Sequence, residues 1–141
     1  MHCLMQLLTK RQLMPKKEIN RILFFTPAIG WGVLICYFSL MPSIEVPSML
    51  KSISDFVLHF SIYGALSLLI FLGFTRFTFY SIALKKVNLV MVFCILLGLA
   101  IELIQEKFIP GRQFEWSDVL FNSLGSMLVA ALNKIVPASK L

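Results

Sequence analysis

Ionisable and amide side chains interrupt three long apolar stretches of this sequence. Asp55 and His59 are four residues apart near the start of one stretch, and Glu102 lies toward the end of the next. Asp118 and Asn122 are again four residues apart, near the start of the last. Residues four apart share one face of a helix. Charged groups in an apolar segment are costly, and they normally face a partner or a ligand, so these residues are the first candidates for chemistry.

The residue types allow several kinds of chemistry. His59 could act as a nucleophile or general base toward a lipid phosphate or ester, oriented by Asp55 or Glu102. The candidates for a catalytic role are His59, Glu102 and Asp118. A divalent ion could be held by His59 with these carboxylates, but HxxxH and CxxC spacings are absent, so we predict no metal site and no cofactor. A serine nucleophile beside His59 has no nucleophile-elbow motif around it.

The elements that must position these residues follow from composition. Of the 141 residues 58% are hydrophobic and only 14% are charged, and the mean hydropathy is +0.85, which is typical of a chain dissolved in a bilayer. The sequence predicts an all-α fold: a polytopic membrane protein with a compact bundle of four transmembrane helices. The predicted spans are 22–41, 56–75, 87–105 and 119–136. The fourth span is the shortest and contains Asn122 and Lys134.

The distribution of positive charge predicts an orientation. With a cytoplasmic N-terminus, ten basic residues lie inside: Lys10, Arg11, Lys16, Lys17, Arg21, Arg76, Lys85, Lys86, Lys134 and Lys140. Only three lie outside: Lys51, Lys107 and Arg112. This bias predicts a plasma-membrane protein with both termini in the cytoplasm. The expected parts are a cytoplasmic basic segment (1–21), the four-helix domain (22–136) and a short cytoplasmic tail (137–141). The charge of +6 is thus an orientation signal, and no nucleic-acid partner is predicted.

In this orientation the polar residues share a depth. His59 and Asn122 each lie about one turn, ~6 Å, inside the outer ends of their helices. Glu102 lies one turn before Gln105, near the outer end of its own helix, and Gly98 one turn further inward permits close helix approach. We therefore expect three helices to bring these side chains together near the extracytoplasmic surface.

The connection before the last span adds a cation to this region. Pro110 and Gly111 predict a turn. Arg112 follows it and could pair with a carboxylate or bind an anionic ligand. The predicted ligand-binding residues are Asp55, His59, Tyr63, Glu102, Gln105, Arg112, Asp118 and Asn122. The alternative is that these polar side chains only join the helices through hydrogen bonds.

The motifs SLMP, D…HF..Y..L, E..Q and P.R.F.W.D…N..G resemble the VanZ-like family of small bacterial membrane proteins, across about residues 36–130. The matching residues are Ser39, Pro42, Asp55, His59, Tyr63, Glu102, Gln105, Arg112, Asp118, Asn122 and Gly125. Many relatives have a lysine after the aspartate where this chain has Phe56, which puts in doubt any role that needs a cation there. The family's founding member is linked to low-level teicoplanin resistance, so the resemblance implies a role in the cell envelope.

The leading hypothesis is a polar pocket on the extracytoplasmic side that binds a lipid, a lipid-linked wall intermediate or a glycopeptide-type amphiphile. Arg112 would take the anionic group, while Glu102 and Asp118 hold Arg112 and His59 in place. One alternative is a membrane-embedded hydrolase or phosphotransferase acting on a lipid head group. Another is a small transporter subunit, although no charge sits in the middle of a span.

Overall fold

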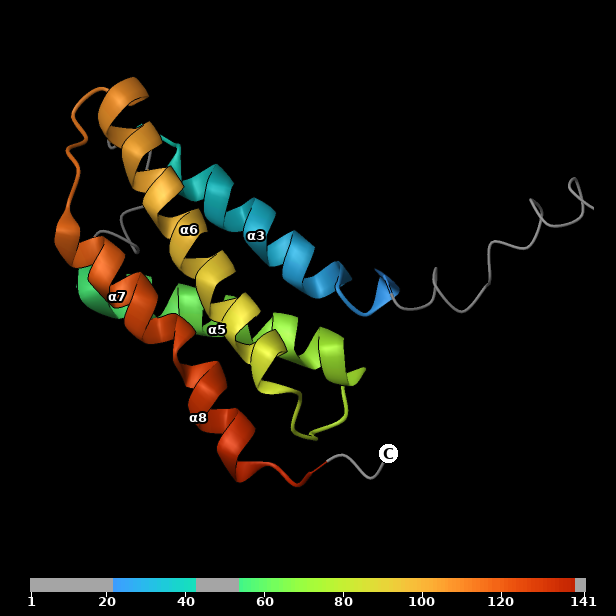
Figure 1. Ribbon diagram of the computed structural model, residues 1–141. Coiled ribbons are helices and arrows are strands. Elements are labelled where there is room, and N and C mark those ends of the chain that lie inside the picture. The colour runs from blue at the N-terminus through green and yellow to red at the C-terminus, as the bar shows by residue number, and fades with distance from the viewer. Residues whose placement is uncertain (1–21, 43–53, 139–141) are drawn as a thin grey trace, which may run out of the picture.

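The structure, a computed structural model, describes residues 22–42 and 54–138, and all the regular structure in these ranges is helical (Figure 1). The helices are α3 (Thr26–Ser39), α5 (Asp55–Thr75), α6 (Leu84–Phe108), α7 (Trp116–Ser126) and α8 (Leu128–Ile135). The predicted N-terminal segment 1–21 and residues 139–141 of the predicted tail lie outside the described ranges. The all-α prediction is confirmed for the described residues.

Two of the predicted spans correspond to long helices. α5 has 21 residues and α6 has 25, and among the described residues these two are long and apolar enough to cross a membrane. α3 has only 14 residues, with a proline in its first turn. At ~1.5 Å per residue it covers about 21 Å, less than the ~30 Å of a hydrocarbon core. Proline has no backbone N–H, and the first turn of a helix needs none for its intrahelical hydrogen bonds, so Pro27 suits this position.

The fourth predicted span is divided into α7 and α8, which meet at a bend at Met127 (Figure 1). Two serine hydroxyls in α7 bond to carbonyls of their own helix: Ser123 to Val119, and Ser126 to Ser123, both at 2.7 Å. Such bonds compete with the backbone ladder and commonly bend helices. Serines next to the small Gly125 therefore explain the division of this segment.

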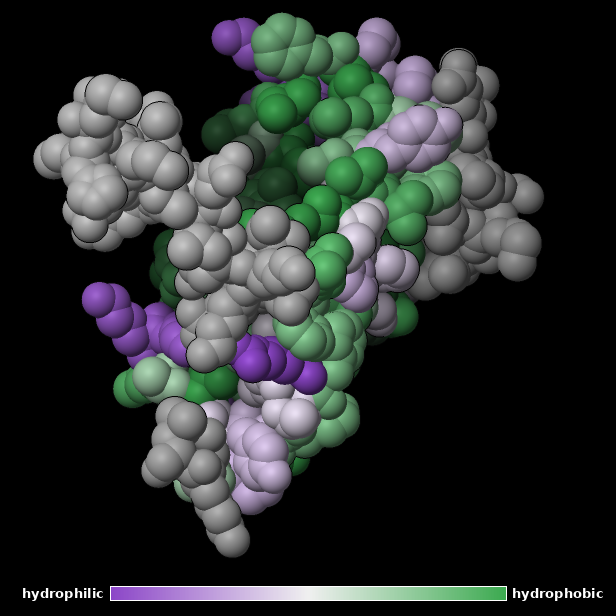
Figure 2. All heavy atoms as spheres, turned by 90° about the vertical axis from the view of Figure 1, so that its right-hand side faces the viewer, coloured by the Kyte–Doolittle hydropathy of each residue, from purple (hydrophilic) through white to green (hydrophobic). Residues whose placement is uncertain are grey.

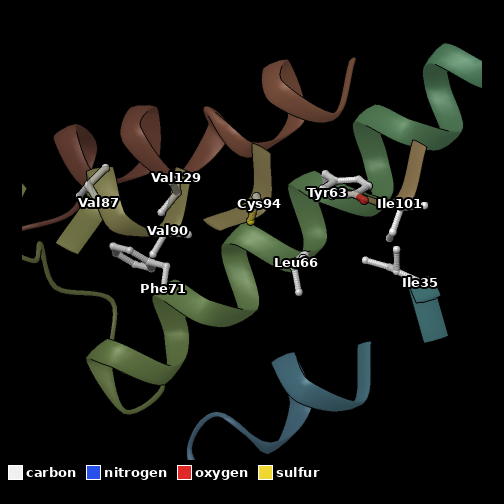
Figure 3. Close-up of a cluster of buried hydrophobic side chains, with 9 residues drawn as sticks. All are labelled: Ile35, Tyr63, Leu66, Phe71, Val87, Val90, Cys94, Ile101 and Val129. Atoms are coloured by element: carbon white, nitrogen blue, oxygen red, sulfur yellow. The ribbon is translucent and has the colours of Figure 1, made fainter. Parts of the chain in front are cut away.

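The core lies between the helices (Figure 3). Its buried side chains are Ile35, Tyr63, Leu66, Phe71, Val87, Val90, Cys94, Ile101 and Val129. They come from α3, α5, α6 and α8. Trp31 in α3 donates a 3.0 Å hydrogen bond from Nε1 to the carbonyl of Ile62 in α5. This bond ties the short first helix to the rest of the bundle.

Apolar side chains are widespread on the face shown in Figure 2, and many large hydrophobic residues are exposed. On α6, Leu89, Val92, Phe93 and Leu96 are each at least half exposed. Their spacing of three and four residues forms a continuous apolar stripe on one helix face. Soluble proteins rarely expose a stripe of this kind, so it indicates a surface that meets an apolar solvent.

The backbones of α5 and α7 are in close contact. A Cβ added to Gly125 would collide with the carbonyl oxygen of Phe60 and lie 3.0 Å from the backbone nitrogen of Gly64. The two helices can approach this closely only because small residues face each other. This contact joins the N-terminal part of α5 to the C-terminal end of α7 and fixes how the two helices are aligned.

The connection between α5 and α6 is held at the other end of the bundle. The Asn133 side chain accepts a hydrogen bond from the Ile82 amide at 2.7 Å and donates one to the Ile82 carbonyl at 3.1 Å. One asparagine therefore satisfies both backbone groups of a residue outside any helix.

Candidate functional site

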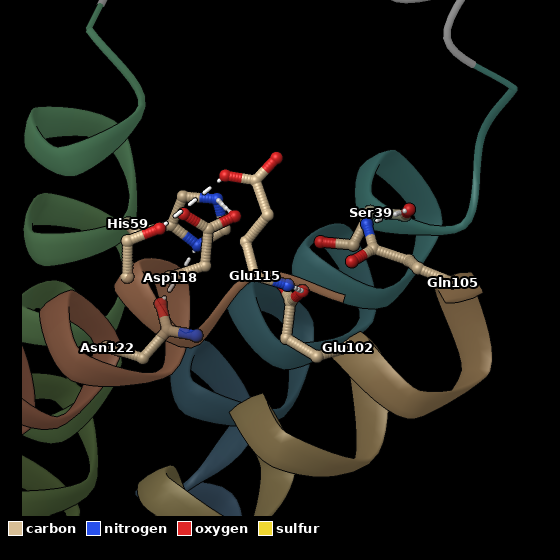
Figure 4. A network of polar contacts seen from close by, with 8 residues as sticks. Ser39, His59, Glu102, Gln105, Glu115, Asp118 and Asn122 are labelled. Carbon is tan, nitrogen blue, oxygen red and sulfur yellow. Dashed lines mark hydrogen bonds and ion pairs between the residues drawn. The ribbon is translucent and has the colours of Figure 1, made fainter. Parts of the chain in front are cut away.

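A polar cluster lies where the N-terminal ends of α5 and α7 meet the C-terminal part of α6 (Figure 4). The Nε2 atom of His59 is 3.1 Å from Oδ2 of Asp118, and the two side chains are 20% and 14% exposed. The Nδ1 atom of His59 is 3.0 Å from Oδ1 of Asn122. Glu102 completes the cluster from α6. The predicted convergence of three helices on these side chains is confirmed.

Helix spacing and close packing explain why these residues meet. Asp118 and Asn122 lie on one face of α7, so one ring of His59 can contact both. His59 directly precedes Phe60, whose carbonyl contacts Gly125, and this contact fixes the height of α7 along α5. On the other side, Asn122 lies against Gly98 of α6, where a Cβ would be 2.7 Å from Nδ2.

Glu102 is the most deeply buried ionisable group of the cluster, at 2% exposure. Its Oε2 accepts a 3.3 Å hydrogen bond from the backbone amide of Glu115. Among the described residues, its other oxygen makes no hydrogen bond and no lysine or arginine pairs with it. One ligand atom from each of His59, Glu102 and Asp118 lies within 4.8 Å of the others, so this trio could hold a metal ion.

Gln105 lies beside the cluster and joins a fourth helix to it. Its Nε2 donates a 2.7 Å hydrogen bond to the carbonyl of Ser39, the last residue of α3. The last carbonyls of a helix have no partner within the helix, so Gln105 satisfies one of them. Gln105 is 5% exposed. The sequence could not predict this use of the Ser39 backbone carbonyl, because every residue type has a backbone carbonyl.

Two predicted site residues do not join the cluster. Asp55 is exposed at the first position of α5, outside the trio of possible metal ligands. Tyr63 is 3% exposed and belongs to the hydrophobic core. Two turns of helix below Asp55 are enough to carry Tyr63 past the polar end of the bundle and into the region where helices pack on apolar side chains.

Arg112 follows the predicted turn, in which Gly111 has a φ of 80° and the Arg112 amide bonds to the Ile109 carbonyl at 3.2 Å. Its side chain is half-buried, and within residues 22–42 and 54–138 its buried Nε has no hydrogen-bond partner. No carboxylate of the described residues forms an ion pair with it. The expectation that Glu102 and Asp118 hold Arg112 is therefore wrong, whereas the expected contact of Asp118 with His59 is present.

The hydrogen-bond partners of His59 also bear on the two catalytic arrangements considered above, a serine nucleophile beside His59 and a carboxylate that orients its ring. Both ring nitrogens are engaged, one by Asp118 and one by Asn122, so no serine of the described residues is placed as a nucleophile. The enzyme alternative had Asp55 or Glu102 orienting the ring, but Asp118 does so, as the pocket hypothesis expected. Glu115, whose amide binds Glu102, was missed because a backbone donor leaves no signal in the residue type.

Two helices of membrane length, an apolar outer stripe and ionisable groups buried between helices indicate a helical membrane protein with a polar site near one end. The chain matches the VanZ/LLP1 family model over residues 4–137. It therefore belongs to the VanZ/LLP1 family, which confirms the resemblance drawn from its motifs. Searches of curated proteins and of solved structures found no match.

Proposed function

We propose that this VanZ/LLP1 protein is a four-span protein of the cell envelope whose polar cluster binds the head group of an amphiphile. The four spans are α3, α5, α6 and the α7–α8 pair, with both termini in the cytoplasm. The excess of lysine and arginine on the predicted cytoplasmic side supports this orientation. The cluster then lies on the extracytoplasmic side, near the lipid head groups.

The observation that carries the proposal is the burial of Glu102 among helices whose outer faces are apolar. A carboxylate in this setting costs stability, and such groups are normally kept for binding or transfer. Hydrogen bonds between helices need only serine, threonine or asparagine. The presence of histidine and two carboxylates therefore favours a ligand over a purely structural role.

Arg112 supplies the anion-binding group in this proposal. A guanidinium binds phosphate or carboxylate through paired hydrogen bonds, and the Arg112 Nε is a buried donor that has no partner among the described residues. The ligand class is an amphiphile with an anionic head group: a membrane lipid, a lipid-linked wall intermediate or a glycopeptide-type antibiotic. His59, Asp118 and Asn122 face its uncharged polar groups.

Mass spectrometry of protein extracted in native nanodiscs tests this assignment. We expect one anionic amphiphile class to be enriched with the wild type, retained by Lys107→Ala and lost by Arg112→Ala at equal protein abundance. Lys107 is the matched control because it is an exposed cation at the same end of α6. Identical lipid profiles for all three proteins would contradict the proposal.

A cellular assay separates the possible sources of the ligand. If the ligand is a glycopeptide, expression of the wild type lowers susceptibility to teicoplanin and Arg112→Ala removes this protection. If the ligand is a lipid or a wall intermediate, the nanodisc profile changes with Arg112→Ala while teicoplanin susceptibility does not.

The His59–Asp118 pair favours a second function, a membrane-embedded enzyme acting on a lipid head group. A histidine held by a carboxylate and partly exposed can act as a general base once a substrate group takes the place of Asn122 at Nδ1. Release of phosphate or head group from native lipids by the purified protein, lost in His59→Gln, would decide for this function.

A further inference from the structure

We propose that His59, Glu102 and Asp118 form a binding site for one divalent transition-metal ion. The three residues lie on α5, α6 and α7, and one ligand atom from each lies within 4.8 Å of the others (Figure 4). This inference goes beyond the proposed function, because it requires no particular amphiphile.

The hydrogen bond from Asn122 sets the tautomer of His59. The Asn122 Nδ2 faces Gly98, which leaves Oδ1 facing His59 Nδ1 at 3.0 Å. An amide oxygen only accepts, so Nδ1 carries the proton and Nε2 of the neutral ring carries a lone pair. Histidines that bind metals commonly donate their second N–H to a carbonyl or carboxylate in this way. Asn122 is thus a positioning residue.

A cation is needed between His59 and Asp118. The Nε2 lone pair faces the Oδ2 atom of Asp118 at 3.1 Å, and two electron-rich atoms at this distance repel each other unless a proton or a metal ion lies between them.

Charge balance favours a metal ion over a proton. Glu102 is 2% exposed and has no cationic partner among the described residues. With protons alone, both His59 and Glu102 would have to be protonated to neutralise the two carboxylates, whereas one divalent ion neutralises both. A neutral centre is the less costly one in a region of low dielectric.

The ligand types narrow the choice of ion. One imidazole and two carboxylates suit Zn²⁺ or Mn²⁺, whereas Mg²⁺ and Ca²⁺ prefer oxygen alone. Metal–ligand bonds of about 2.0–2.2 Å put ligand atoms about 3–3.6 Å apart. His59 Nε2 and Asp118 Oδ2 already have this spacing at 3.1 Å, so it is Glu102 that must approach them, by about 1 Å. Three protein ligands leave a further coordination position open.

Metal titration of the purified full-length protein in detergent tests the site. After removal of metal with a chelator, we expect the wild type and Glu106→Gln to bind one Zn²⁺ per chain. Glu106 is the control because it is an exposed carboxylate next to the C-terminal end of α6. Glu102→Gln and Asp118→Asn should bind at least about tenfold more weakly, since loss of even an outer-shell partner costs about 10–100-fold.

Absence of binding by the wild type, or equal binding by Glu102→Gln, would overturn the inference. If a variant fails to fold, Co²⁺ added to the wild type decides: visible absorption bands of coordinated Co²⁺ support the site and the spectrum of the hydrated ion contradicts it. The measurement uses no lipid or antibiotic ligand, so its outcome is independent of the nanodisc experiment on Arg112.

Discussion

Gly125 in α7 lies directly against the backbone carbonyl of Phe60 in α5, with no space for a methyl group between them. This contact stands one residue away from His59 and three residues from Asn122, so helix packing and the polar cluster are part of the same interface. The geometry of the candidate site therefore depends on residues that make no polar contact at all.

We predict that Gly125→Ala destabilises the protein strongly, because the added Cβ would force α5 and α7 apart. Overpacking of this kind costs about 1–3 kcal/mol. Gly32→Ala is the matched control: nothing lies within 4 Å of its Cβ position, so it should be neutral or slightly stabilising. Unfolding in mixed micelles with increasing SDS measures both. Equal stability of the two variants would show that α5 and α7 are not in backbone contact.

We predict that Asn122→Ala lowers the free energy of unfolding by about 1–3 kcal/mol, because it leaves the Nδ1 proton of a half-buried His59 without an acceptor. Ser123→Ala provides the control, since the Ser123 hydroxyl bonds only to a carbonyl of its own helix. Its effect should stay within about 0.5 kcal/mol. If both variants lose the same stability, the bond between Asn122 and His59 contributes nothing specific.

We predict that Asn133→Ala loosens the α5–α6 connection without changing the polar cluster. Both backbone groups of Ile82 lose their partner, at a cost of about 1–2 kcal/mol. Hydrogen exchange at the Ile82 amide should become about tenfold faster. Lys134→Ala, an exposed neighbour, should leave the exchange rate unchanged. An unchanged exchange rate in Asn133→Ala would contradict the proposed role of Asn133 in holding the α5–α6 connection.

We predict opposite labelling of two single-cysteine variants made in a background without Cys3, Cys36 and Cys94. A membrane-impermeant maleimide added to intact cells should label Gln113→Cys, in the α6–α7 connection, and leave Lys134→Cys unlabelled. Both positions are exposed in the structure, so both should react after permeabilisation. The reverse pattern would invert the proposed topology and place the polar cluster on the cytoplasmic side.

The sequence predicted α5 and α6 well because each contains about twenty consecutive, mostly apolar residues. In lipid, a segment of this kind satisfies its backbone hydrogen bonds by forming a helix. It did not predict that α3 begins only at Thr26, four residues after the predicted start of the span, or that the last span bends at Met127. The start of α3 depends on Pro27, and the bend depends on serine hydroxyls that bond to backbone carbonyls of α7. Mean hydropathy contains no information on either effect.

The members of the polar cluster were largely predictable, but their pairing was not. Helical rise alone put His59, Glu102 and Asn122 at a common depth. The rotation of each helix about its own axis is set by contacts such as that of Gly125 with Phe60. This rotation brings Asp118 against His59, and Arg112 forms no ion pair with a carboxylate of the described residues. Tyr63 was placed in the cluster by spacing along one helix, although its depth belongs to the core.

The cluster draws its side chains from three helices, while the glycines that hold those helices together occupy other positions. The polar groups of the cluster and the close contacts between helices are thus supplied by different residues. Changes at positions 59, 102 and 118 would therefore alter the polar groups of this interface without altering the glycine contacts between the helices.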